Sequence, residues 1–236
     1  MKFRDLLNEA SNTLNVDNVS LEKAKKYAAS EFKKDNKDLD GLLDSFDKNY
    51  KLIQKKLKKA KDIPRIDMPV IKSTDMKEFQ KKLESGSIDI FEPLAKKEWD
   101  ALKIKTQFPK DLDSSKGKDW VNLGRKDGDI KDDVIKTKLT KMSAKELLPS
   151  QNQIWLEVMV KGLLKFGKVK PNSFTTKKTI IVTKDKYILD GHHRWAQVML
   201  SDPNIKMDVL FVPIKFDSLA KIARSYGNAI GRTQNQ

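Results

Sequence analysis

Two adjacent histidines, His192 and His193, are the only histidines among the 236 residues. They lie in the segment Asp190-Gly191-His192-His193-Arg194, between the apolar run 187–189 and the apolar run that begins at Trp195. The pattern predicts that a strand ends and a helix begins here. The first backbone N–H groups of a helix have no partner within the helix, and its dipole is positive at that end, so such a turn attracts anions. The segment therefore predicts a phosphate-binding turn.

Each residue of this segment has a property that suits phosphate chemistry. Gly191 lets the backbone approach a phosphate closely, and Arg194 supplies a permanent forked donor. His193 supplies a donor that also transfers protons near neutral pH, so we expect Gly191, His193 and Arg194 to bind the phosphate. Asp190 is expected to orient a histidine or to hold a hydrated magnesium ion. The catalytic candidates are His192, His193 and Asp190.

A metal site built from protein ligands is not expected. Adjacent histidines on a helical turn point about 100° apart, and neither a third histidine nor a cysteine is present to complete a zinc site. The lack of cysteine also excludes disulfides and thiolate catalysis, and it fits a reducing compartment. The N-terminus carries charged residues where a signal peptide would be apolar, and no stretch is typical of a membrane span. We expect a cytoplasmic protein with no membrane partner.

Three regions with different patterns must position the turn. Residues 1–107 carry apolar side chains at helical spacing, which predicts a helical region of unknown function with helices over 3–14, 20–32, 39–57, 75–84 and 93–102. Residues 108–133 are polar and predict a linker. Residues 134–236 predict strands over 134–139, 179–183, 187–189 and 207–212 and helices over 143–148, 154–166, 195–200 and 218–226. The expected fold class is α/β (α+β), with a small α/β domain at 134–236.

The charge of the chain favours an anionic partner. The formal net charge is +15, and the region 141–236 holds 16 basic and 7 acidic side chains, against 32 and 26 in residues 1–140. Clustered basic side chains attract nucleic acid. Lysine-rich composition in an AT-rich genome is the alternative explanation, and the charge alone does not decide between the two.

The order of these elements resembles the ParB/sulfiredoxin superfamily over residues 138–215. The resemblance starts at Leu148-Pro149-Ser150, continues through a helix, a hairpin and the turn, and ends with a closing strand. The equivalent turn reads Gly-Glu-Arg-Arg in ParB, where it binds CTP, and Gly-Cys-His-Arg in sulfiredoxin. Gly191 and Arg194 match both, whereas His192 replaces the catalytic cysteine of sulfiredoxin and so excludes sulfinic acid reduction.

ParB-fold free-serine kinases match the turn at all five positions, Asp190 to Arg194. Those kinases use a glutamate soon after the early proline as base, but here Pro149 precedes Ser-Gln-Asn-Gln and the first acid is Glu157. The accessory candidates are therefore Gln151, Gln153 and Glu157. The whole chain also resembles phage-encoded proteins described as ParB-like nucleases, which would place it in the host cytoplasm or the virion.

Three functions follow as hypotheses. The first is a phage-type ParB-like protein that binds a nucleotide (ATP, ADP or CTP) and binds nucleic acid through its basic surface. This protein would have nuclease or NTPase activity, and magnesium is a further candidate cofactor. The second is an ATP- or ADP-dependent small-molecule kinase or phosphotransferase. The third is a catalytically inactive virion or scaffold protein whose N-terminal helices bind a protein partner. Trp155, Trp195 and Tyr187 are candidates for stacking a base, although each also suits a core position.

Overall fold

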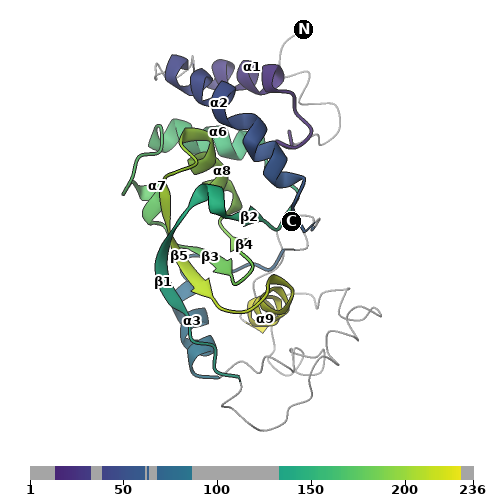
Figure 1. The fold of residues 1–236 in the computed structure, drawn as a ribbon, viewed down its shortest axis with the longest axis vertical. Helices are drawn as coiled ribbons and strands as arrows, with labels where there is room; N and C mark the ends of the chain where they lie inside the picture. The colour runs from purple at the N-terminus through teal and green to yellow at the C-terminus, as the bar shows by residue number, and fades with distance from the viewer. Residues whose placement is uncertain (1–13, 33–38, 62, 64–67, 87–132, 230–236) are drawn as a thin grey trace. The chain divides into compact units, whose positions relative to one another are not determined.

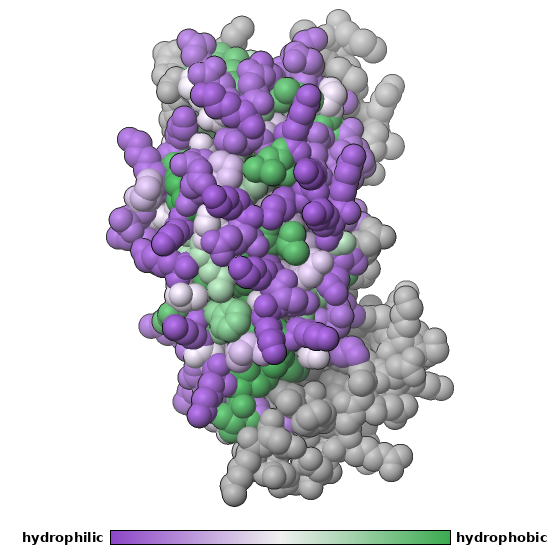
Figure 2. Space-filling model, in the orientation of Figure 1, coloured by the Kyte–Doolittle hydropathy of each residue, from purple (hydrophilic) through white to green (hydrophobic). Residues whose placement is uncertain are grey.

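The computed structural model describes residues 14–32, 39–61, 63, 68–86 and 133–229 (Figure 1). The predicted helix over 93–102 lies outside these residues, as do the predicted helix over 3–14 and the linker over 108–133, apart from Leu14 and Asp133. Within the described residues, helices accompany a five-stranded mixed sheet, so the predicted α/β fold class is confirmed. None of the described helices is both long and apolar enough to cross a membrane. On the face shown in Figure 2, apolar side chains form scattered groups within a largely hydrophilic surface.

The chain divides into two compact units, each assembled from separate pieces of sequence. Unit 1 comprises residues 1–62, 143–177 and 192–207, and unit 2 comprises residues 63–142, 178–191 and 208–236.

Unit 1 is mainly helical. Its elements are α1 (Leu21–Phe32), α2 (Leu39–Leu57), the 3₁₀ turn η3 (Ala144–Glu146), β2 (Leu148–Pro149), α6 (Leu156–Phe166), α7 (Phe174–Lys177) and α8 (His192–Ser201). Helix α1 packs on α2, and α8 contacts α2, α6 and α7 (Figure 1). The predicted helices over 20–32 and 39–57 are confirmed, and the Ser20 hydroxyl accepts a hydrogen bond from the Lys23 amide at 3.3 Å, as expected for an N-cap.

Helix α8 begins three residues before the predicted start at Trp195. Its first turn is His192-His193-Arg194, and these polar residues carry none of the apolar periodicity from which the boundary was predicted. From Trp195 to Ser201 every side chain is buried. The Trp195 indole donates a hydrogen bond to the Ala144 carbonyl at 2.9 Å, which anchors α8 to η3.

Unit 2 holds most of the sheet. Its elements are α3 (Met76–Glu84), β1 (Lys138–Ser143), β3 (Ile180–Thr183), β4 (Tyr187–Asp190), β5 (Lys206–Val212) and α9 (Phe216–Ala229), and the strand order of the whole sheet is β1-β5-β3-β4-β2. Strand β3 pairs antiparallel with β4 and parallel with β5. The predicted hairpin of residues 179–189 is therefore confirmed. Side chains of α3, β3, β4, β5 and α9 form one apolar core, which includes Phe79, Leu83, Ile181, Leu210 and Phe216.

Strand β1 differs from its prediction, which placed it at 134–139. Ile135 is buried in the apolar core of unit 2, and its backbone N–H donates to the Leu83 carbonyl at the end of α3. The β-branched side chain of Ile135 therefore packs in the core from an irregular segment and not from a strand. In β1 itself three of the six residues are exposed, including Leu139, and only Ser143 is buried, so no alternation of apolar and polar residues marks this edge strand.

Candidate functional site

A single glycine joins strand β4 to helix α8. Strand β4 ends at Asp190, α8 begins at His192, and Gly191 between them has φ of 104°. This region of backbone space is open to glycine and strained for residues with a Cβ atom. Gly191 thus allows the chain to pass from strand to helix in one residue, and it brings three polar side chains into the first helical turn.

His192 is a buried acceptor of hydrogen bonds. Its Nε2 atom lies 3.2 Å from the Ser150 backbone nitrogen, 3.4 Å from the Gln151 backbone nitrogen and 3.0 Å from the Ser150 hydroxyl oxygen. Because a backbone N–H only donates, Nε2 carries no proton here, and these contacts assign the ring hydrogen to Nδ1. The ring is 95% buried, so it satisfies amides that water does not reach.

His193 makes the same kind of contact one residue later. Its Nε2 atom accepts a hydrogen bond from the Trp155 amide at 3.0 Å. The imidazole ring of His193 and the indole ring of Trp155 meet edge to face with centroids 6.3 Å apart. Helix α6 begins at the next residue, Leu156. The two histidines therefore hold residues 150–155, which connect β2 to α6, against the first turn of α8.

Arg194 supplies the fixed positive charge of the turn. Its side chain is half-buried, and its Nε atom lies inside the protein. The first turn of α8 contains no acidic residue, so the charge of Arg194 adds to the positive end of the helix dipole. Asp190 lies half-buried at the end of β4, one residue before Gly191.

The accessory candidates lie along the same connection. Gln151 is buried, its amide reaches His192, and its side chain donates to the Gln153 carbonyl. Glu157 accepts a hydrogen bond from the Leu14 amide at 3.1 Å. The pKa of Tyr27 is raised above its usual range, mainly by burial, then by the charge of Glu31 and then by that of Glu157. Glu157 thus bonds to the N-terminal part of unit 1.

The residues that precede α1 contact this connection, and nothing in the sequence indicated the pairing. The Val16 amide donates to the Ile154 carbonyl, and the Leu156 amide donates to the Leu14 carbonyl, each at 2.8 Å. The Asn15 side chain accepts from the Ile154 amide at 3.0 Å and donates to the Asn152 carbonyl at 3.2 Å. Such pairing joins residues far apart in sequence and leaves no local pattern. The connection 150–155 is therefore anchored by α8 and by residues 14–16.

A polar cavity of about 510 Å³ opens beside these contacts. It is lined by Asn15, Asp17, Asn18, Leu57, Lys58, Ala60, Asn152 and Gln153. The buried Asp17 Oδ1 atom accepts no hydrogen bond within the described part of the chain.

The three aromatic candidates for base stacking differ in burial. Trp195 is completely buried, so its ring is a core element and not a stacking surface. Trp155 is half-buried beside His193, and Tyr187 is half-buried beside Phe216 with ring centroids 5.9 Å apart.

Comparisons with known proteins give no relative. No family model, curated protein or solved structure matches this chain. The ParB/sulfiredoxin resemblance thus depends on the residues of the chain alone. Among the described residues, no group of three or more His, Cys, Asp or Glu side chains is placed to hold a metal ion.

The geometry does not favour proton transfer by the two histidines of this turn. Both Nε2 atoms accept hydrogen bonds from backbone amides, so neither can take a proton from a substrate without giving up that bond. Ser150, the hydroxyl closest to His192, is completely buried. Arg194 is half-buried and remains the fixed positive charge of this turn.

Proposed function

We propose that the first turn of α8 binds the phosphates of a nucleotide, in the manner of a ParB/sulfiredoxin-like domain, and that the chain associates with nucleic acid. One observation carries the proposal. Gly191, with φ of 104°, leads β4 directly into a helix whose first turn contains His192, His193 and Arg194 and no acid. Such a turn combines backbone donors, a helix dipole and a fixed positive charge.

The sequence supports the same proposal. Asp190 to Arg194 agree with the turn of ParB-fold kinases at every position, and Gly191 and Arg194 agree with ParB itself. The excess of basic over acidic side chains in residues 141–236 suits a phosphate-bearing partner.

Hydrolysis and phosphate transfer are not part of the proposal, because no observation favours either. Both imidazole Nε2 atoms bond to backbone amides, and Glu157 bonds to the Leu14 amide. A general base for turnover is thus not identified among these side chains.

The test is ligand-induced stabilisation measured by thermal unfolding. ATP, ADP and CTP are each added with and without Mg²⁺, and a ligand at 100 times its Kd should stabilise the protein by about 2.7 kcal/mol. Titration calorimetry on Arg194→Ala should then show an affinity loss of about 10- to 100-fold, because a hydrogen bond to a charged group contributes about 1.5–3 kcal/mol. Arg194→Lys keeps the charge without the forked donor and should lose less.

Arg224→Ala is the matched control, because Arg224 is the other arginine among the described residues and lies on α9. It should bind nucleotide as the unmodified protein does. A protein that none of the nucleotides stabilises, or an Arg194→Ala variant that binds with full affinity, would contradict the proposal.

A further inference from the structure

Two phenylalanines stack on each other at the surface of unit 1. The rings of Phe166, at the end of α6, and Phe174, at the start of α7, have centroids 4.8 Å apart and planes 24° apart. They are 45% and 59% exposed, and they are the only aromatic residues among the exposed large apolar side chains of the described chain. The Lys165 ammonium group lies 5.3 Å from the centre of the Phe166 ring. Aromatic side chains contribute much of the energy of binding surfaces, so an exposed stacked pair is a candidate for one.

The segment that carries these rings is strongly cationic. From residue 158 to residue 184 the chain contains no Asp or Glu and seven lysines, at positions 161, 165, 168, 170, 177, 178 and 184. Lys165, Lys168, Lys170 and Lys177 are all exposed. The loop between α6 and α7 therefore presents positive charge beside two aromatic rings.

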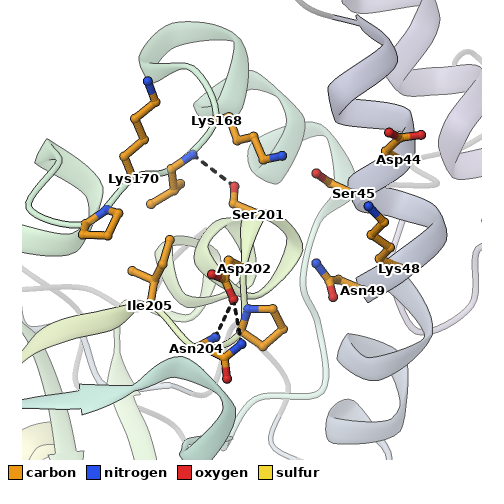
Figure 3. A pocket seen from close by; sticks show the side chains of 13 residues that line it. Asp44, Ser45, Lys48, Asn49, Lys168, Lys170, Ser201, Asp202, Asn204 and Ile205 are labelled. Atoms are coloured by element: carbon orange, nitrogen blue, oxygen red, sulfur yellow. Dashed lines mark hydrogen bonds between the residues drawn. The ribbon is translucent and has the colours of Figure 1, made fainter.

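The same loop lines a cavity of about 550 Å³ (Figure 3). Lys168 and Lys170 come from this loop, Lys48 comes from α2, and Ser201 and Asp202 come from the end of α8. Among the described residues none of the three lysines forms an ion pair. The loop is held in place by the Val169 amide, which donates to the Ser201 hydroxyl at 3.1 Å.

Two acids also line the cavity, Asp44 and Asp202. The Asp202 Oδ1 atom already accepts hydrogen bonds from the Asn204 amide at 2.8 Å and from the Asn204 side chain at 3.0 Å. Three lysines and two acids line the cavity, and one of the acids is engaged, so the lining keeps a positive balance that suits a phosphate.

We infer that this surface, which we call the α6–α7 surface (Lys165, Phe166, Lys168, Lys170 and Phe174), binds single-stranded nucleic acid. Unpaired bases stack on the exposed rings, and the neighbouring lysines neutralise the phosphates. A duplex hides the faces of its bases, so it can use only the lysines. The charge of the segment selects a polyanion, and the rings select one with exposed aromatic bases.

This surface is separate from the proposed nucleotide site. The turn lies at the start of α8, whereas the cavity beside the α6–α7 surface lies at its end, and a helix of 10 residues is about 15 Å long. Strand binding here rests on the nucleic-acid association proposed above, but Arg194→Ala should leave it unchanged, so the nucleotide site and the α6–α7 surface can fail separately.

The experiment is fluorescence anisotropy with a labelled oligothymidine of about 15 nucleotides, titrated over a range of salt concentrations. The variant Phe166→Ala with Phe174→Ala removes the rings, and Lys168→Ala with Lys170→Ala removes two charges. Leu139→Ala, which removes an exposed apolar side chain from unit 2, controls for the rings. Lys51→Ala with Lys55→Ala on α2 controls for the charges.

The two variants should differ in whether the affinity or the salt dependence of binding changes. Removing the rings should lower the affinity about 10-fold or more and leave the salt dependence unchanged, because stacking releases no counterions. Removing the lysines should make the log–log salt slope shallower by about 1.4, or about 0.7 for each phosphate contact. Both control variants should bind as the unmodified protein does, and the single strand should bind more tightly than a duplex of equal length.

Three results of the anisotropy titrations would overturn the inference. They are full affinity in the variant without the rings, equal loss in the Lys51/Lys55 control, and a duplex that binds as tightly as the single strand. Vesicles containing anionic lipid serve as the competing partner, and a preference for vesicles that depends on the rings would also overturn it. Circular dichroism checks the fold of each variant, and the exposure of the replaced side chains predicts that all of them fold.

Discussion

The Nε2 atom of His192 lies 3.2 Å from the backbone nitrogen of Ser150 and 3.0 Å from the hydroxyl of the same residue. His192 was a catalytic candidate because of its position in the sequence. In the structure its ring bonds to the chain that connects β2 to α6, so its removal should affect stability before it affects any chemistry.

We expect His192→Ala to lower the free energy of unfolding by about 1–3 kcal/mol, because the buried amides of Ser150 and Gln151 lose their acceptor. His192→Gln places an oxygen acceptor near the position of Nε2 and should recover much of this loss. His193 accepts a hydrogen bond from the Trp155 amide but is only half-buried, so His193→Ala should cost less. Urea denaturation measures all three, and an unchanged midpoint for His192→Ala would show that these bonds do not stabilise the fold.

Gly191→Ala should destabilise the protein and weaken nucleotide binding together. A Cβ atom at φ of 104° costs on the order of 1–3 kcal/mol, and relief of that strain would displace the first amides of α8. Gly167→Ala is the matched control, since Gly167 has φ of 75° and open space around an added Cβ, but lies at the far end of α6. It should lose stability and keep its affinity for nucleotide. Equal affinities in the two variants would argue against a role for the backbone at Gly191.

Gly162 and Gln197 should be energetically coupled. A Cβ atom on Gly162 would lie 2.0 Å from the Gln197 Nε2 atom, and Gln197 is 94% buried. Gly162→Ala should therefore destabilise the protein although alanine favours a helix by about 1 kcal/mol over glycine. Adding Gln197→Ala should remove the clash, so the double variant should be more stable than the sum of the two single changes predicts. Additive effects in this double-mutant cycle would refute the coupling.

Stability should fall in alkali because of two buried tyrosines. Burial, followed by the charge of Asp17, raises the pKa of Tyr50 above its usual range, and burial also raises the pKa of Tyr27. A raised pKa in the folded state favours the protonated form, so this contribution is complete below about pH 10 and is lost as the pH rises further. Absorbance of the phenolate should show both groups ionising as the protein unfolds.

Tyr50→Phe tests the assignment. The Tyr50 hydroxyl donates to the Val16 and Val19 carbonyls, each at 3.1 Å, so the variant should be less stable at neutral pH. Its loss of stability above pH 10 should be shallower than that of the unmodified protein, and an equally steep loss would assign the effect to other groups.

The sequence predicted the elements whose apolar residues recur at the period of their own structure. Leu42, Phe46, Tyr50 and Ile53 lie on one buried stripe of α2, and the β-branched run of β3 is buried throughout. The bounds of strand β1 were not predicted because only one of its six residues is buried, and β2 and α7 are too short to show a period. The first residue of α8 was not predicted correctly because the first turn of the helix is polar.

The candidate turn could be located from residue types, but its hydrogen bonds could not be predicted. Asp190 to Arg194 stood out as polar or glycine residues between two apolar runs, and the structure adds that Gly191 has a positive φ of 104°. That Ser150, Gln151 and Trp155 donate to the two imidazoles depends on how β2 and α6 pack beside α8. No pattern within a short window of sequence carries that information.

The assembly of unit 1 from distant pieces has a consequence for how the chain folds as it is synthesised. The Asn49 side chain bonds to the Leu200 carbonyl across 151 positions, and Leu14 bonds to Glu157 across 143. Helices α1 and α2 can pack on each other early, but they leave the ribosome long before α6 and α8, on which they also pack. Contacts of such high order slow folding, and the part of α2 that packs on α8 stays exposed on the nascent chain until α8 has been made.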